Sequence, residues 1–153
     1  IARATTGGGS SLLANTLVNC VAHGNTTWGF NCTRNESLVN CVAVSNTTYG
    51  FNTGDHTTLI NCASYNNTTA RRNTAPMLDQ GAITCTGDPF VNAASDDFTP
   101  DATANEGALL RAAGINPYGH TGYLDVGAVQ HQDSGGGGNV VNPIGSVNSI
   151  PGI

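Results

Sequence analysis

The sequence predicts an all-β protein, a single-stranded parallel β-helix (solenoid) with a C-terminal cap and an extended tail. The first observation behind this is a repeat: "LVNCVAHGNTTWGFN" at residues 17–31 returns 21 residues later as "LVNCVAVSNTTYGFN" at residues 38–52. The second is that the apolar runs in each copy are short and interrupted by Asn or Gly, which is typical of strands of about three to five residues. Such a unit can close one turn of a solenoid, in which identical side chains stack at a spacing of about 4.8 Å.

Two columns of identical residues define the repeat: Asn19, Asn40 and Asn61, followed directly by Cys20, Cys41 and Cys62. Asparagine suits a tight corner between strands because it tolerates a left-handed backbone better than most residues. Its side-chain amide can also bond to the amides above and below it. We therefore expect an asparagine ladder at one corner of the solenoid.

The cysteines that follow these asparagines are expected to point inward as a column of free, buried thiols. In-register stacked thiols have parallel Cβ directions, which is poor geometry for a disulfide. An aligned column also cannot surround a metal ion tetrahedrally. The total of five cysteines is odd, which argues against a disulfide framework and favours assembly in a reducing compartment. We predict no metal and no cofactor.

The repeat and the composition divide the chain into four segments. Solenoid turns occupy residues 1–86, with repeats at 17–37, 38–58 and 59–69; a closing segment follows at 87–134, a glycine linker at 135–138 and an extended docking tail at 139–153. The third repeat breaks at Ala70-Arg71-Arg72.

The repeat "LVNCVA..N...GF" resembles the rungs of right-handed parallel β-helix proteins of the pectate-lyase-like class. The resemblance continues in "GDPFVNAASDDFTP" (87–100), "ALLRAAGIN" and "GYLDVGAVQ", which look like the closing segment of such chains. It covers about residues 10–131 and implies a right-handed solenoid whose later acidic residues have turn and cap roles. The class includes lyases, glycosidases, adhesins and virion proteins, so the resemblance points to a fold rather than to a function.

Composition excludes several classes of function. The chain has 153 residues, the size of one domain, and a net charge of −5, and its five basic residues are scattered arginines. Nucleic-acid binders instead concentrate basic side chains on one face, so nucleic acid is not an expected partner. No apolar run approaches the roughly 18 residues that a membrane span needs.

Catalytic residues are not apparent in the repeats. Residues 17–69 contain only two acids, Glu36 and Asp55, whereas glycosidases and lyases of this fold need a carboxylate cluster. Asp55 follows Arg34 by one repeat, which predicts a surface ion pair between them. The four histidines share no column, and we expect them to be surface residues.

Two features point to binding. Trp28 and Tyr49 occupy equivalent positions; directed outward they would form a stacking platform for sugar rings, and directed inward they would be core. The tail is apolar and strand-like, so we expect it to dock on its own solenoid or on a partner chain through six aliphatic residues: Val140, Val141, Ile144, Val147, Ile150 and Ile153.

The sequence thus favours a non-enzymatic structural or adhesive module of a larger assembly, located on a bacteriophage virion surface as a capsid decoration or fibre protein that could also bind carbohydrate. Its expected partners are other chains of the assembly, copies of itself and surface polysaccharide. One alternative is a fragment of a polysaccharide lyase or depolymerase. The other is an adhesin, secreted or on the bacterial cell surface.

Overall fold

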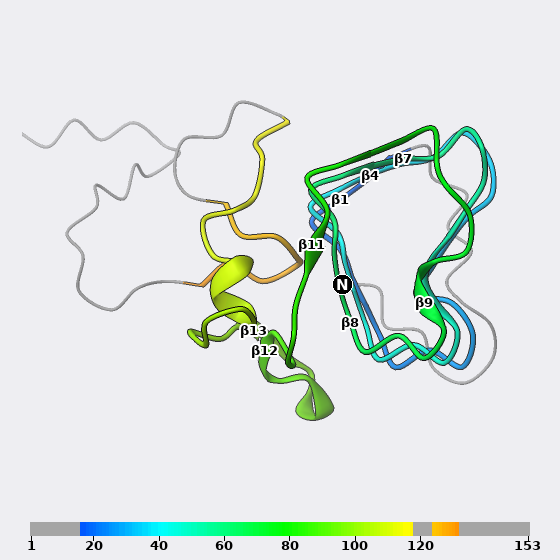
Figure 1. Cartoon of the computed structure of the whole chain (residues 1–153). Helices are drawn as coiled ribbons and strands as arrows, with labels where there is room; N and C mark the ends of the chain where they lie inside the picture. Colours follow the sequence, from blue (N-terminus) through cyan, green and yellow to red (C-terminus); the bar gives the residue numbers. More distant parts are fainter. Residues whose placement is uncertain (1–15, 118–123, 132–153) are drawn as a thin grey trace, which may run out of the picture.

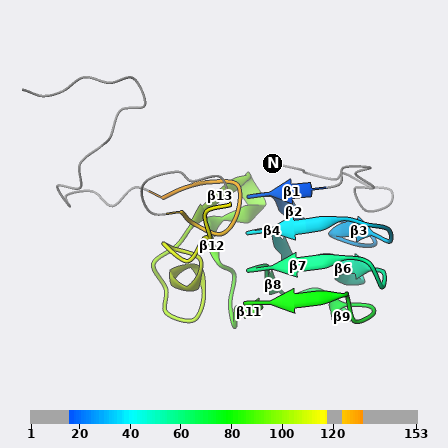
Figure 2. The ribbon, with the colours of Figure 1, turned by 90° about the horizontal axis from the view of Figure 1, so that it is seen from above.

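The computed structural model describes residues 16–117 and 124–131. It confirms the all-β prediction: parallel sheets stack into a β-solenoid of about 3 turns with almost no helix. Figure 1 looks along the solenoid axis, so that the turns nearly superimpose, and Figure 2 shows the same turns from the side as a stack.

Three parallel sheets form the walls of the solenoid. The first sheet has the order β1 (Thr16–Val18), β4 (Ser37–Val39), β7 (Thr58–Ile60) and β10 (Leu78–Gln80). The second consists of β2 (Val21–His23), β5 (Val42–Val44), β8 (Ala63–Tyr65) and β11 (Ile83–Thr84). The third consists of β3 (Phe30–Cys32), β6 (Tyr49–Thr53) and β9 (Ala70–Arg72). Within the repeats, paired residues are one repeat apart, as in Leu17 opposite Leu38.

The corner between the first two sheets explains the asparagine column. Asn19, Asn40 and Asn61 have φ values of 53°, 53° and 52°, and Gly81 takes the equivalent place after β10 with φ 65°. This left-handed conformation is costly for most side chains but accessible to asparagine and glycine. The residue choice at this column therefore sets where each turn bends.

The second sheet is buried on both faces. In β5, Ala43 belongs to the core inside the solenoid, whereas Val42 and Val44 belong to a second core outside it. The inner core also contains the stacked residues Phe30 and Phe51. A strand covered on both sides is apolar at successive positions, which accounts for the uninterrupted "VAV" of this strand.

The closing segment supplies the outer core. It contains β12 (Phe90–Asn92), η1 (Ala93–Ser95), β13 (Asp97–Pro100) and η2 (Gly107–Leu109), with β12 and β13 paired antiparallel. Phe90, Phe98, Leu110 and Val126 from this segment join the outer core on the second sheet. The segment therefore lies against the side of the solenoid (Figure 1).

In the described residues, no helix has the length and apolar character required to cross a membrane.

Candidate functional site

The predicted asparagine ladder is present. Nδ2 of Asn40 donates to Oδ1 of Asn19, and Nδ2 of Asn61 donates to Oδ1 of Asn40, both at 3.0 Å. The same side chains hold the closing segment, because Asn40 Nδ2 donates to Ile115 O at 2.7 Å and Ile115 N donates to Asn40 Oδ1 at 3.0 Å. This column thus joins the turns to one another and to the segment that covers them.

Two more asparagine columns form ladders that we did not predict. They are Asn25, Asn46 and Asn67, and Asn31, Asn52 and Asn73. The sequence signal was available, since each column recurs at the repeat spacing. Repeated asparagine in register is therefore a ladder signal at every column of this chain, not only at the left-handed corner.

The second ladder has a defined direction. Both the backbone N–H and the side-chain Nδ2 of Asn25 donate to Oδ1 of Asn46, at 3.0 and 2.7 Å. Asn46 donates in the same way to Oδ1 of Asn67. Each carbonyl oxygen therefore receives two donors from the preceding turn. Oδ1 of Asn25, at the start of the ladder, has no hydrogen-bond partner although Asn25 is only 1% exposed.

The cysteine column lies inside the solenoid, as expected. Cys41 and Cys62 are fully buried members of the inner core, and Cys20 is partly buried against it. All five cysteines are free. A hydrogen bond from the Cys41 thiol lowers the pKa of Cys20 to about 6, whereas burial raises the pKa of Cys41 well above its ordinary value. Cys20 is therefore more readily ionised than Cys41.

Trp28 and Tyr49 are partly buried and belong to neither core. A Cβ at the next residue, Gly29 or Gly50, would lie 3.1 or 3.0 Å from the inward-facing Cβ of Ala43. The glycines therefore face the inside of the solenoid, and the preceding aromatic residues are directed away from it. The geometry favours the outward orientation of the pair.

The end of the inner core is closed by Arg71, which replaces the repeat pattern in the third copy. Its guanidinium carbon lies 5.3 Å from the ring centroid of Phe51, whose other face stacks on Phe30 at 5.4 Å. Asp79 binds this guanidinium through both oxygens, at 2.5 and 3.0 Å. The sequence break at Ala70-Arg71-Arg72 is thus a polar cap that we did not predict.

The predicted ion pair between Arg34 and Asp55 is wrong: it is not among the salt bridges of the described residues. Both residues are exposed, where water and salt weaken such attraction. Glu36 instead accepts a hydrogen bond from Arg34 N at 2.7 Å and is itself buried. The carboxylate closes a turn rather than bridging two turns.

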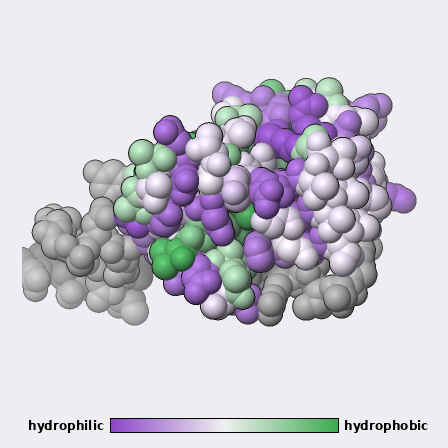
Figure 3. All heavy atoms as spheres, turned by 60° about the horizontal axis from the view of Figure 1, so that its bottom comes forward, coloured by the Kyte–Doolittle hydropathy of each residue, from purple (hydrophilic) through white to green (hydrophobic). Residues whose placement is uncertain are grey.

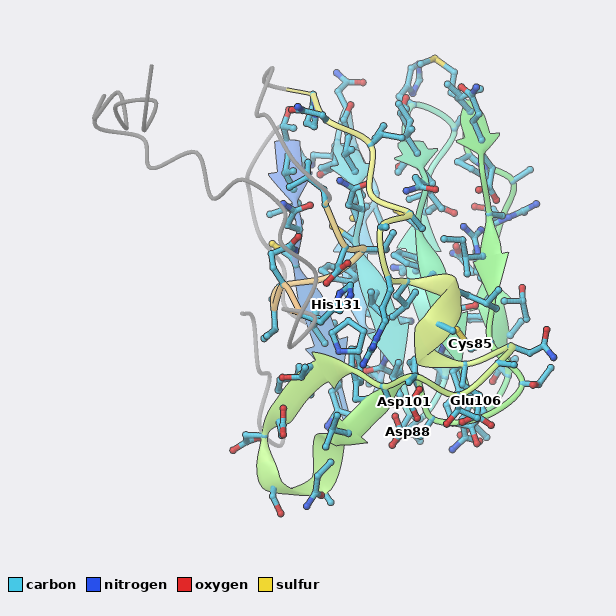
Figure 4. The ribbon with its side chains drawn as sticks, turned by 90° about the vertical axis from the view of Figure 1, so that its left-hand side faces the viewer. Cys85, Asp88, Asp101, Glu106 and His131 are labelled. Carbon is cyan, nitrogen blue, oxygen red and sulfur yellow. The ribbon has the colours of Figure 1, made fainter. Side chains whose placement is uncertain are left out.

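Three acids of the closing segment gather near Cys85 (Figure 4): Asp88, Asp101 and Glu106. Burial, reinforced by these carboxylates, raises the pKa of Cys85 to about 11. Asp88 accepts a hydrogen bond from Phe90 N at 3.1 Å, and Asp101 accepts one from Gly107 N at 2.9 Å. The two aspartates thus have the turn roles implied by the resemblance. Within residues 16–117 and 124–131, no group of three or more His, Cys, Asp or Glu side chains is arranged to hold a metal ion.

His131 is not the exposed surface residue that we expected. Its side chain is 11% exposed, and its Nδ1 lies 2.5 Å from Oδ2 of Asp125. Oδ1 of this buried aspartate accepts a hydrogen bond from Ala112 N at 2.8 Å. The aspartate joins two parts of the closing segment. The pairing could not be read from the sequence because no repeat aligns these residues.

Hydrophilic residues and residues of intermediate hydropathy dominate the face shown in Figure 3, and hydrophobic residues form only small groups on it. The six aliphatic residues of the predicted docking tail lie outside the described residues. Comparisons of the chain with protein-family models, with curated proteins and with solved structures found no match. The structure shows the parallel β-solenoid, and membership of the pectate-lyase-like class stays a prediction.

Proposed function

We propose that this chain is a non-enzymatic structural or adhesive module of a larger assembly, located on a bacteriophage virion surface as a capsid decoration or fibre protein. The observation that supports this best is the use of its polar side chains. Asparagine amides run from turn to turn, and the carboxylates of Glu36, Asp79 and Asp125 each bond to groups of the chain itself. Groups held in such contacts stiffen a scaffold and are poorly placed to exchange protons with a substrate.

The free thiols support the same proposal. All five cysteines are unpaired, and two of the three in the inner column are fully buried. Proteins that mature in oxidising compartments commonly use disulfides, whereas free thiols suit assembly in a reducing cytoplasm. A virion protein assembled inside a bacterial cell fits this better than a secreted adhesin does.

Carbohydrate binding is a second candidate function, carried by Trp28 and Tyr49. The two residues occupy equivalent places in successive turns, and neither belongs to a core. Aromatic side chains with an apolar face and a polar edge are common at interfaces. Outward rings on a rigid sheet would suit a repeating polysaccharide, which presents similar sugar faces at regular intervals.

A single titration series separates these functions from the depolymerase alternative. The full chain is mixed with pectin, alginate, capsular polysaccharide or lipopolysaccharide, and both released sugar ends and fluorescence are recorded. Trp28 is the sole tryptophan, so its fluorescence reports binding at this surface. We expect no released ends, and saturable quenching by a surface polysaccharide that Tyr49→Ala weakens.

Released ends that disappear in Asp101→Asn or Glu106→Gln would contradict the non-enzymatic proposal. Quenching that is unchanged by Tyr49→Ala would remove the carbohydrate role and leave the structural one.

A further inference from the structure

Among the described residues, the second asparagine ladder begins at Asn25. Its later members each give two donors to the carbonyl oxygen of the next asparagine. By that rule Oδ1 of Asn25 should receive a backbone N–H and a side-chain amide from a preceding turn. This oxygen is unpaired and Asn25 is almost completely buried. A buried acceptor without a donor is costly, so this end is suited to receiving another asparagine.

The structure defines what a preceding turn must offer along its length. It needs asparagine at the left-handed corner occupied by Asn19, and a second asparagine six positions later, to follow Asn25. Four positions further it needs glycine, because a Cβ on Gly29 would lie 2.5 Å from Gly50 O. The next position, that of Phe30, must be apolar because it fills the inner core.

The C-terminal tail carries this pattern. Aligned with "LVNCVAHGNTTWGF" at 17–30, the tail reads "VVNPIGSVNSIPGI" at 140–153. The two ladder asparagines, the inward glycine and the apolar residue after it are all matched, by Asn142, Asn148, Gly152 and Ile153. These are the four positions at which a solenoid turn is most strongly constrained. An apolar composition of the tail would not by itself produce asparagine and glycine at these positions.

We propose that residues 140–153 are a displaced solenoid turn that docks on the N-terminal end of the same chain's solenoid. Asn148 then donates to the unpaired Oδ1 of Asn25, and Asn142 accepts from Asn19 at the corner ladder. The site is the N-terminal edge of the first turn, from the partly exposed Asn19 to the buried Asn25, and its ligand is an asparagine-bearing strand segment of this chain. This inference does not depend on the virion function proposed above.

The first proline of the tail is compatible with this register. Pro143 aligns with Cys20, and the N–H groups that bond between turns at this corner belong to its neighbours, as in Asn19 N to Val39 O and Val42 N to Cys20 O. Proline at the cysteine position therefore removes neither bond. It does disfavour the left-handed conformation of the residue before it, so the tail turn needs the docking surface to hold it.

The tail can reach this end of its own solenoid. A Cβ on Gly127 would lie 3.4 Å from Cγ2 of Val21, so residues 124–131 run beside the first turn, as Figure 2 also shows. The ten residues from His131 to Val140 are joined by nine peptide bonds, and this segment spans up to about 30 Å when extended. A short flexible tether gives a high effective concentration, which favours the tail of the same chain over that of a neighbour.

The test uses the full-length chain and a matched pair of substitutions, Asn148→Ala and Asn139→Ala, the second of which lies just outside the aligned turn. One hydrogen bond of about 1 kcal/mol corresponds to about a fivefold change in an equilibrium constant. We expect Asn148→Ala to lower the folding equilibrium constant about fivefold and Asn139→Ala to leave it unchanged. In an Asn25→Ala background the effect of Asn148→Ala should fall below about twofold, because the partner is gone.

Hydrogen exchange at Val21 provides an independent readout. The equivalent N–H groups of Val42 and Ala63 donate to carbonyls of the preceding turn, so docking should protect Val21 N–H and Asn148→Ala should expose it. Protection should not change with protein concentration. Equal behaviour of Asn148→Ala and Asn139→Ala would overturn the proposal, and protection that rises with concentration would overturn the assignment to the same chain.

Discussion

Replacing Asn46 with alanine should strongly destabilise the protein. Its side chain makes four hydrogen bonds: Nδ2 donates to Asn67 Oδ1 at 2.8 Å and to Ala22 O at 3.3 Å, and Oδ1 accepts from N and Nδ2 of Asn25. Asn46 is fully buried, so water cannot replace these partners. At about 1 kcal/mol for each bond, the loss is roughly 4 kcal/mol, which is large for a point substitution.

Asn31→Ala is the matched control, because it removes the same amide from the end of another ladder. Asn31 accepts one bond, from Asn52 Nδ2 at 2.6 Å, and is partly exposed. Water can take its place there, and the expected cost is below about 1 kcal/mol. Both variants are unfolded in urea and followed by circular dichroism at a β-sheet wavelength. If Asn46→Ala costs no more than Asn31→Ala, the ladders do not stabilise the solenoid as argued.

Three further experiments test other parts of the structure. The rate of Cys20 alkylation, monitored by mass spectrometry, should rise as the pH increases through about 6, since the Cys41 thiol lowers the pKa of Cys20 and stabilises its thiolate. In Cys41→Ala the midpoint of this pH dependence should move upward, and an unchanged midpoint would refute this explanation. Gly50→Ala should lower stability in urea more than Gly24→Ala does, because a Cβ at Gly50 would lie within 3.0 Å of three atoms. A Cβ at Gly24 would meet open space, so Gly24→Ala costs only the strain of a φ of 68°, about 1 kcal/mol. The reverse order would be inconsistent with an inward-facing glycine at position 50. Arg71→Met should lower the urea midpoint by an amount corresponding to about 2 kcal/mol, because it leaves a partly buried carboxylate without its main partner; a midpoint equal to that of the unmodified protein would show that the cap is dispensable.

The repeat made most of the solenoid predictable. Identical columns at a fixed spacing specify which residues stack, so the left-handed corner at Asn40, its ladder and the buried Cys41 follow from alignment alone. The other two ladders carried the same signal. In a stacked solenoid, residues one repeat apart in the sequence contact each other in space. This part of the fold could therefore be predicted from the sequence.

Features outside the period were not predictable in this way. Arg71 reaches Asp79 because β10 pairs with β7 and places Asp79 opposite Leu59, at a separation of 20 residues rather than the 21 of the repeat. Asp125 meets His131 inside a closing segment that has no internal repeat. The expected pair of Arg34 and Asp55 failed for the opposite reason: one repeat of separation places two residues in a column but does not direct exposed side chains toward each other. Column membership is thus reliable for buried residues and weak for exposed ones.

The mass and copy number of the native particle that contains this chain test the central claim most directly. Particles purified from the natural source without denaturation can be weighed by native mass spectrometry or imaged by electron cryomicroscopy. The structural proposal predicts that the chain is present in many copies on the surface of a large, regular assembly. A free monomer or small oligomer that depolymerises a polysaccharide would contradict it.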